Sequence, residues 1–178
     1  MRIDDLPGDL IMWVLIASEL AVFAAGLTAM MAMWLTDPAG FAAAQAQLDG
    51  RMAALNTVIL VTSGLFAARA ERAARLGDRT GARKALALAA LGGILFMIVK
   101  STEYFRDFGV GIGMETHPFF TFYFLLTGFH AAHVIAGIVV FGIVALKARA
   151  EGVQAGAMFW HMVDLVWVLI LPPIYLLG

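Results

Sequence analysis

Five long apolar runs divide this chain and restrict what it can fold into. They cover residues 10–35, 53–70, 85–104, 119–146 and 156–177. About 20 apolar residues in a helix cross the hydrocarbon core of a bilayer, so each run is long enough for one crossing. Because backbone polar groups find no water there, a helix is the natural form for such a run. We therefore expect an all-α integral membrane protein, a single domain over residues 1–178 with five transmembrane helices.

The composition agrees with this fold class and excludes several functions. The chain is 62% apolar and 14% charged, whereas soluble proteins are about 45–50% apolar and about 25% charged. It contains no cysteine, which excludes disulfides and thiolate metal sites. We find no phosphate-binding, zinc-protease or serine-nucleophile motif and no basic stripe for nucleic acid. The connections are expected to be short, broken at Asp37-Pro38 and Gly40, at Gly77-Asp78, at residues 109–113 and at Glu151-Gly152.

The basic residues predict the orientation. Nine of the twelve Lys and Arg residues fall on the side of the N-terminus: Arg2, Arg69, Arg72, Arg75, Arg79, Arg83, Lys84, Lys147 and Arg149. Basic loops are retained in the cytoplasm. We therefore expect a multi-pass protein of the bacterial inner membrane with a cytoplasmic N-terminus and a periplasmic C-terminus. The Arg-rich connection then sets topology and contacts anionic lipid.

Glu19 lies in the middle of the first apolar run. A carboxylate at that depth has to be protonated or paired, and such groups often mark a functional site. Two readings stay open here. Glu19 is either a hydrogen-bonded link to another helix or a group that exchanges protons.

Four more polar residues lie within apolar runs, at helical three-residue spacings: His130 with His133, and His161 with Asp164. Each pair shares one helix face. Neutral histidine is a common metal ligand, yet this spacing is weakly specific. Buried histidines that hydrogen-bond to Asp164, Glu19 or lipid head groups satisfy the same pattern. We favour a structural polar cluster, with proton transfer and haem or metal ligation as alternatives, and assign no catalytic, cofactor-binding or metal-ligating residue.

Lys100 and Glu103 lie three residues apart near the end of the third run. At this spacing their side chains meet on one face, which predicts an ion pair at the helix end. The alternative is a polar access site that leads to a partner or to a quinone site.

Several stretches of the sequence together resemble subunit III of the haem–copper oxidase superfamily. They are SELAVFAAG from Ser18, LNTVILVTSG from Leu55, KSTEY from Lys100, FLLTGFHAAHVIAGIVV from Phe124 and FWHMVDLVWVLILPPIYLLG from Phe159. The match runs in order through all five runs and looks like the five-helix form of a family that usually has seven helices. The opening LPGDLIMWVLIASEL resembles the nitric-oxide-reductase-associated E protein. The stretch AARAERAARLGDRTGARK departs from the oxidase pattern.

The resemblance implies an accessory, non-catalytic subunit that supports assembly and sustained turnover. Such a subunit carries no haem or metal of its own, packs against the catalytic membrane subunit and binds phospholipid in a cleft. The resemblance further implies that the complex is a nitric oxide reductase, with a cytochrome c or quinol terminal oxidase as the alternative. Glu19 matches the family's carbodiimide-sensitive glutamate, and the histidines and Asp164 match polar positions that are not metal ligands.

Two other classes remain as competing hypotheses. In one, two histidines on the fourth and fifth helices ligate a haem b. In the other, the chain is a small ion transporter that uses Glu19 and the histidines as a relay. Transporters commonly contain internal repeats, and we find none in the sequence.

Overall fold

The structure, a computed structural model, describes residues 10–176. This part of the chain forms six helices and no strand: α1 (Leu10–Trp34), α2 (Pro38–Gln45), α3 (Gly50–Arg75), α4 (Arg79–Gly109), α5 (Pro118–Lys147) and α6 (Ala150–Tyr175). All except α2 are long and apolar enough to cross a membrane. The prediction of an all-α protein with five membrane spans is confirmed. Arg2, residues 6–9 of the opening motif and Leu177 lie outside the described residues.

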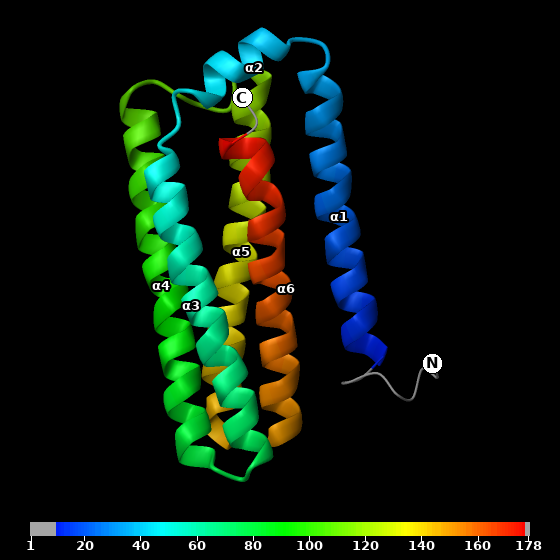
Figure 1. The fold of residues 1–178 in the computed structure, drawn as a ribbon, viewed down its shortest axis with the longest axis vertical. Helices are drawn as coiled ribbons and strands as arrows, with labels where there is room; N and C mark the ends of the chain where they lie inside the picture. The colour runs from blue at the N-terminus through cyan, green and yellow to red at the C-terminus, as the bar shows by residue number, and fades with distance from the viewer. Residues whose placement is uncertain (1–9, 177–178) are drawn as a thin grey trace.

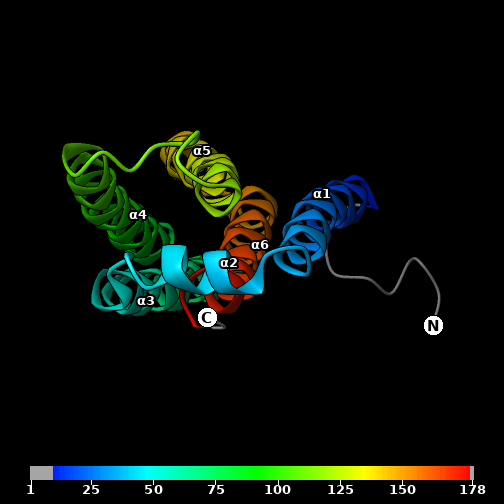
Figure 2. The same cartoon turned by 90° about the horizontal axis from the view of Figure 1, so that it is seen from above.

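Four of the long helices form a bundle, and the fifth lies along its side. Helix α3 contacts α4 and α6, and α5 also contacts α4 and α6, which closes a ring (Figure 1). Helix α1 packs mainly against the α5 and α6 side of this ring, and the view from above shows it beyond α6 (Figure 2). Only Phe23 and Met30 of α1 are buried. Most of the α1 surface is thus left for lipid or for another protein.

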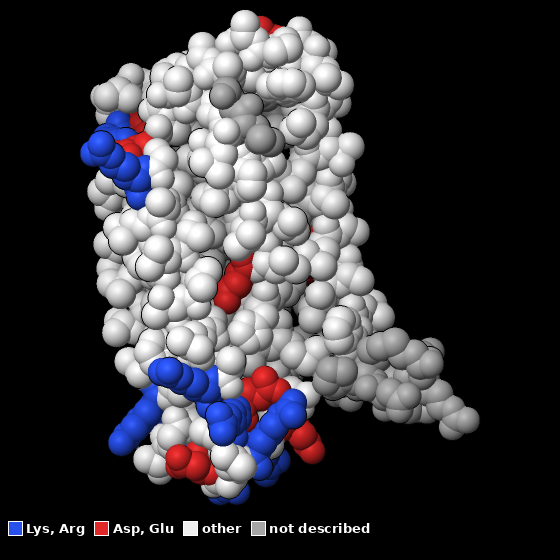
Figure 3. All heavy atoms as spheres, viewed as in Figure 1, with Lys and Arg blue, Asp and Glu red and all other residues white. Residues whose placement is uncertain are grey.

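The chain starts α1 and finishes α6 at opposite ends of the bundle, as an odd number of spans requires (Figure 1). The short α2 crosses the end at which α6 finishes. Charged side chains gather toward the two ends, with a broad and mostly uncharged band between them (Figure 3). A band of this kind is what a membrane-spanning bundle presents to lipid. Which end faces the cytoplasm stays a prediction.

The helices run further than the apolar runs that predicted them. Helix α3 continues to Arg75, and α4 extends from Arg79 to Gly109. Aspartates begin α2, α3 and α4, because the side chains of Asp37, Asp49 and Asp78 accept hydrogen bonds from backbone N–H groups of the first turn. Such caps replace hydrogen bonds that the helix start lacks.

The expected break at Glu151-Gly152 is wrong. Both residues belong to α6, and the chain turns at Ala148, which has a left-handed backbone with φ 47°. A glutamate in the first turn interacts favourably with the positive end of the helix dipole, so Glu151 begins a helix here rather than breaking one. The Arg83 guanidinium donates to the Ala145 and Leu146 carbonyls, 2.9 Å from each, and so closes the end of α5.

Candidate functional site

Glu19 on α1 and His133 on α5 form a side-chain hydrogen bond between these two helices. Glu19 Oε2 lies 3.1 Å from His133 Nε2, and the two side chains are 27% and 14% exposed. His133 Nδ1 lies 2.8 Å from the Phe129 carbonyl, which can only accept, so Nδ1 carries a hydrogen. The contact between His133 Nε2 and Glu19 Oε2 therefore contains one proton, which is carried either by the imidazole or by the carboxyl group. This pair can link helices and can hold a proton near the middle of α1.

His130 faces α6 and not α1. Its ring is fully buried, and Nε2 donates to the Val163 carbonyl over 3.1 Å. The ring lies between Phe96 and Trp167, with centroid distances of 5.4 and 5.2 Å. His130 thus joins α5 to α6 inside the bundle.

His161 and Asp164 lie on the side of α6 that meets α3. His161 Nδ1 is 3.7 Å from Asp164 Oδ2, which is longer than a hydrogen bond. Asp164 packs against Gly64 of α3, where an added Cβ would collide with its carboxylate. The His161 side chain is 45% exposed. The pair therefore lies at the surface of the bundle, where lipid or another subunit can reach it.

The four groups that the spacing pattern singled out do not form one centre. His133 faces α1, His130 faces the bundle interior, and His161 with Asp164 faces the α3 side. Within residues 10–176, no group of three His, Asp or Glu side chains is placed to hold a metal ion. These polar residues therefore lie in three separate places: the Glu19–His133 link, the His130–Val163 link and the His161–Asp164 pair on α6.

Lys100 and Glu103 meet inside the bundle. Lys100 Nζ lies 3.1 Å from Glu103 Oε2, and the two side chains are 1% and 0% exposed. The sequence places this pair at a helix end because the apolar run stops at residue 104. Helix α4 in fact continues to Gly109, so the pair lies within the helix and is covered by α5 and α6.

Other members of this buried group were missed by the sequence reasoning. Tyr123 of α5 and Tyr175 of α6 accept hydrogen bonds from Lys100, and Asp107 lies within 3.0 Å of the Tyr123 hydroxyl. One signal was present, since Asp107 follows Glu103 by four residues and Lys100 by seven, which places all three on one face of α4. The tyrosines come from distant segments and carried no comparable signal.

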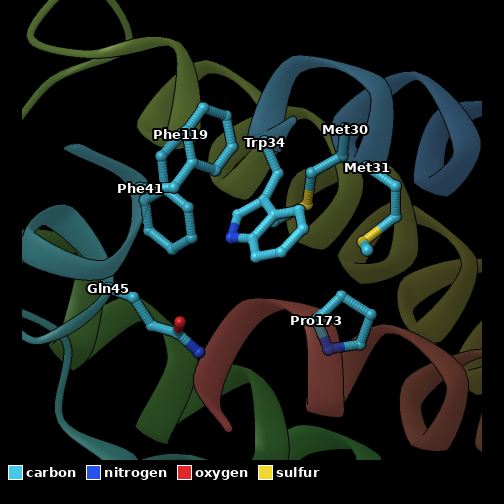
Figure 4. A pocket seen from close by; sticks show the side chains of 7 residues that line it. All are labelled: Met30, Met31, Trp34, Phe41, Gln45, Phe119 and Pro173. Carbon is cyan, nitrogen blue, oxygen red and sulfur yellow. The ribbon is translucent and has the colours of Figure 1, made fainter. Parts of the chain in front are cut away.

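A small pocket lies at the end of the bundle where α1, α2, α5 and α6 meet (Figure 4). Its volume is about 170 Å³. Its walls are largely apolar, and it is lined by Met30, Met31, Trp34, Phe41, Gln45, Phe119 and Pro173. Gln45 is 9% exposed, and its Nε2 has no hydrogen-bond partner in the structure. The pocket thus offers a donor at one edge of an apolar space.

Two carboxylates outside the spans tie the connections of the same end together. Asp49 lies 2.9 Å from the Arg106 guanidinium, and Asp37 lies 3.4 Å from His117. The Arg106 hydrogen bond, and after it the Arg51 backbone N–H, lowers the pKa of Asp49. The Gly40 backbone N–H, followed by His117, lowers the pKa of Asp37.

The fold and the site together define a class: a polytopic α-helical membrane protein whose ionisable side chains link its helices. The family model of cytochrome c oxidase subunit III matches residues 10–178. The chain therefore belongs to the cytochrome c oxidase subunit III family.

Relatives named cytochrome c oxidase subunit 3 occur in very different organisms. The Synechocystis protein is 29% identical over 91% of this chain and 72% of its own length. The Corynebacterium diphtheriae protein is 34% identical over 67% of this chain and 62% of its own length. The Rattus norvegicus protein is 34% identical over 70% of this chain, and the match spans about half of the rat protein, 49%.

Proposed function

We propose that this chain is an accessory, non-catalytic subunit of a respiratory complex of the haem–copper superfamily. Its membership in the subunit III family, matched from residue 10 onward, is the observation that carries the proposal. The chain packs against the catalytic membrane subunit in the bacterial inner membrane. Haem and metal belong to that partner and not to this chain.

The geometry of the ionisable groups supports this role. Glu19 contacts His133, His130 contacts a backbone carbonyl, and Lys100 contacts Glu103. Each contact joins residues of the chain to one another instead of surrounding a space in which a substrate could react. No observation on residues 10–176 specifically favours haem b ligation or ion transport, so we propose neither.

Nitric oxide reductase is our proposal for the complex. Its support is the opening stretch from Leu6 to Leu20, which resembles the nitric-oxide-reductase-associated E protein. A terminal oxidase is the second candidate, favoured by relatives that are named cytochrome c oxidase subunit 3.

Purification of the tagged chain from its own membranes tests both the accessory role and the identity of the complex. We expect a haem-containing catalytic subunit to co-purify in a fixed ratio. Nitric oxide consumption by the purified complex would support the reductase, and oxygen consumption alone would support the oxidase. Recovery of the chain without any haem-containing partner would contradict the accessory role.

We also propose that the pocket of Figure 4 holds part of a membrane phospholipid. Its apolar walls suit a segment of acyl chain, and the unpartnered Gln45 amide can donate to an ester carbonyl. Its place beside α2, at an end of the bundle, is where glycerol esters lie in a bilayer. Native mass spectrometry of Gln45→Leu should show less retained lipid than the wild type. Gln47→Leu is the matched control, because Gln47 is exposed and bonds to its own helix turn at Ala43.

Glu19 and His133 have a proposed role within the same complex. They hold one proton in a link between α1 and α5, and this link either secures the position of α1 or buffers a proton at mid-membrane. Glu19→Ala should leave the haem content of the complex unchanged and shorten the time for which it remains active. Loss of haem in this variant would refute the proposal.

A further inference from the structure

Lys100 lies at the centre of a buried cluster formed by α4, α5 and α6, and its hydrogen bonds identify it as a cation. Its Nζ lies 3.1 Å from Glu103 Oε2, 3.1 Å from the Tyr123 hydroxyl and 2.8 Å from the Tyr175 hydroxyl. An ammonium group has three hydrogens to donate, and these three acceptors use them all. The rings of Tyr123 and Tyr104 lie 4.5 and 4.8 Å from Nζ, a distance at which aromatic faces stabilise a positive charge.

The cluster is one hydrogen short if both of its carboxyl groups are ionised. The Tyr123 hydroxyl lies 2.9 Å from Glu103 Oε1 and 3.0 Å from Asp107 Oδ2. A phenol has one hydrogen, and an ionised carboxylate can only accept. The single hydrogen of Tyr175 is directed to the same Glu103 oxygen, over 2.7 Å. One of the two carboxylate contacts of Tyr123 would therefore bring two oxygens together with no hydrogen between them.

The charge count gives the same result independently. Lys100, Glu103 and Asp107 are 1%, 0% and 2% exposed, and their formal charges leave one uncompensated negative charge. A buried charge without a partner is costly, and such groups commonly become neutral instead.

The neighbouring elements do not supply the missing positive charge. On α4, the nearby Arg106 is 46% exposed and directed to Asp49. From α5 and α6, the cluster is contacted by Tyr123, Tyr175 and the ring of Trp167, and Tyr104 bonds to Thr127. His130 of α5 bonds through Nε2 to the Val163 carbonyl and leaves its buried Nδ1 without a partner, as in a neutral imidazole. None of these is a cation.

We propose that this cluster binds one proton, shared between Glu103 and Asp107 through the Tyr123 hydroxyl. With the proton on Asp107, Asp107 donates to Tyr123, and Tyr123 donates to Glu103. Every short contact then contains one hydrogen, and the cluster is neutral. The site is distinct from the Glu19–His133 pair, and it does not depend on which complex the chain belongs to.

Infrared difference spectra of the full chain in lipid nanodiscs at neutral pH test the proposal. A protonated carboxyl has a carbonyl stretch that is separate from carboxylate bands and shifts in heavy water. Asp107→Asn removes one negative charge and keeps a donor toward Tyr123, so the wild type should show one acid band that this variant lacks. Glu103→Gln should lose the same band, since either substitution leaves Lys100 with a single carboxylate and no need for the extra proton.

Two further variants set the limits of the test. Lys100→Met removes the cation and should add a second acid band, because both carboxyls are then neutral. Asp78→Asn changes an exposed cap on the same helix and should leave the acid bands unchanged. If folded Asp107→Asn keeps the full set of acid bands of the wild type, the cluster holds no extra proton and the proposal is wrong.

Discussion

At the residue scale, polar side chains in this protein work as links between helices. A hydrogen bond between membrane helices contributes about 0.6 kcal/mol on average and at most about 1.7 kcal/mol. Glu19 and His133 form such a link between α1 and α5. Because α1 is otherwise held mainly by apolar contacts along one side, this one hydrogen bond is expected to matter for its position.

Glu19→Ala should lower the free energy of unfolding of the purified chain by about 1 kcal/mol. The reason is the loss of the hydrogen bond that joins α1 to α5. Thermal unfolding in mild detergent measures the effect. Ser18→Ala is the control, because the Ser18 hydroxyl donates to the Leu15 carbonyl of its own helix. Removing this hydroxyl should change the free energy of unfolding little. Equal midpoints for the two variants would argue against the link.

At the element scale, close packing of glycines against Trp160 brings α4, α5 and α6 together. An added Cβ on Gly93 of α4 would lie 2.6 Å from the Trp160 ring, and one on Gly137 of α5 would also lie 2.6 Å from the Trp160 Cζ3 atom. The Trp160 side chain is fully buried, so it cannot turn away into solvent or lipid.

Gly137→Ala should therefore destabilise the bundle by about 1–3 kcal/mol, the usual cost of overpacking a filled core. Gly142→Ala on the same helix is a matched control, since nothing lies within 4 Å of the position of its Cβ. It should be neutral or slightly stabilising, because alanine favours a helix more than glycine does. Chemical or thermal unfolding measures the stability of both variants. A Gly137→Ala protein as stable as Gly142→Ala would show that Trp160 does not limit the approach of α5.

The ion pair between Asp49 and Arg106, at the α2 end of the bundle, predicts that the stability of the protein falls at acid pH. The Asp49 pKa is lowered in the folded protein by Arg106, so its stabilisation is present above the unfolded value of about 3.9 and is lost as the pH falls through the lower folded value. Asp49→Asn keeps a side chain able to cap α3 and loses the charge pairing with Arg106. Its unfolding temperature should fall less than that of the wild type between about pH 5 and pH 3. Parallel acid curves for the two proteins would contradict this.

At the scale of the whole molecule, the apolar runs predicted five spans because length and hydropathy suffice for that inference. They missed α2, since eight residues opened by Asp37-Pro38 look like a loop when only spans are sought. They also placed Lys100 and Glu103 near an interface, because the polar end of a long helix is indistinguishable in sequence from a connection. The separation of His130 from His133 depends on which neighbour each side of α5 meets, and no local spacing contains that information.

Membrane orientation is a prediction that the chain is well suited to test, since it has no cysteine of its own. Leu76 lies in the turn before α4 and Val110 in the connection after it, and both side chains are exposed. From the positive-inside rule, we expect an impermeant maleimide on spheroplasts to label Val110→Cys and to label Leu76→Cys only after permeabilisation. The reverse pattern would invert the topology.

We have proposed that this chain sustains the activity of a catalytic partner without taking part in the chemistry. The most direct test is the course of substrate consumption by the purified complex with and without this chain, at equal haem content. We expect equal initial rates and a much faster loss of activity during turnover when the chain is absent. Equal lifetimes, or an initial rate that vanishes while the haem content stays the same, would contradict it.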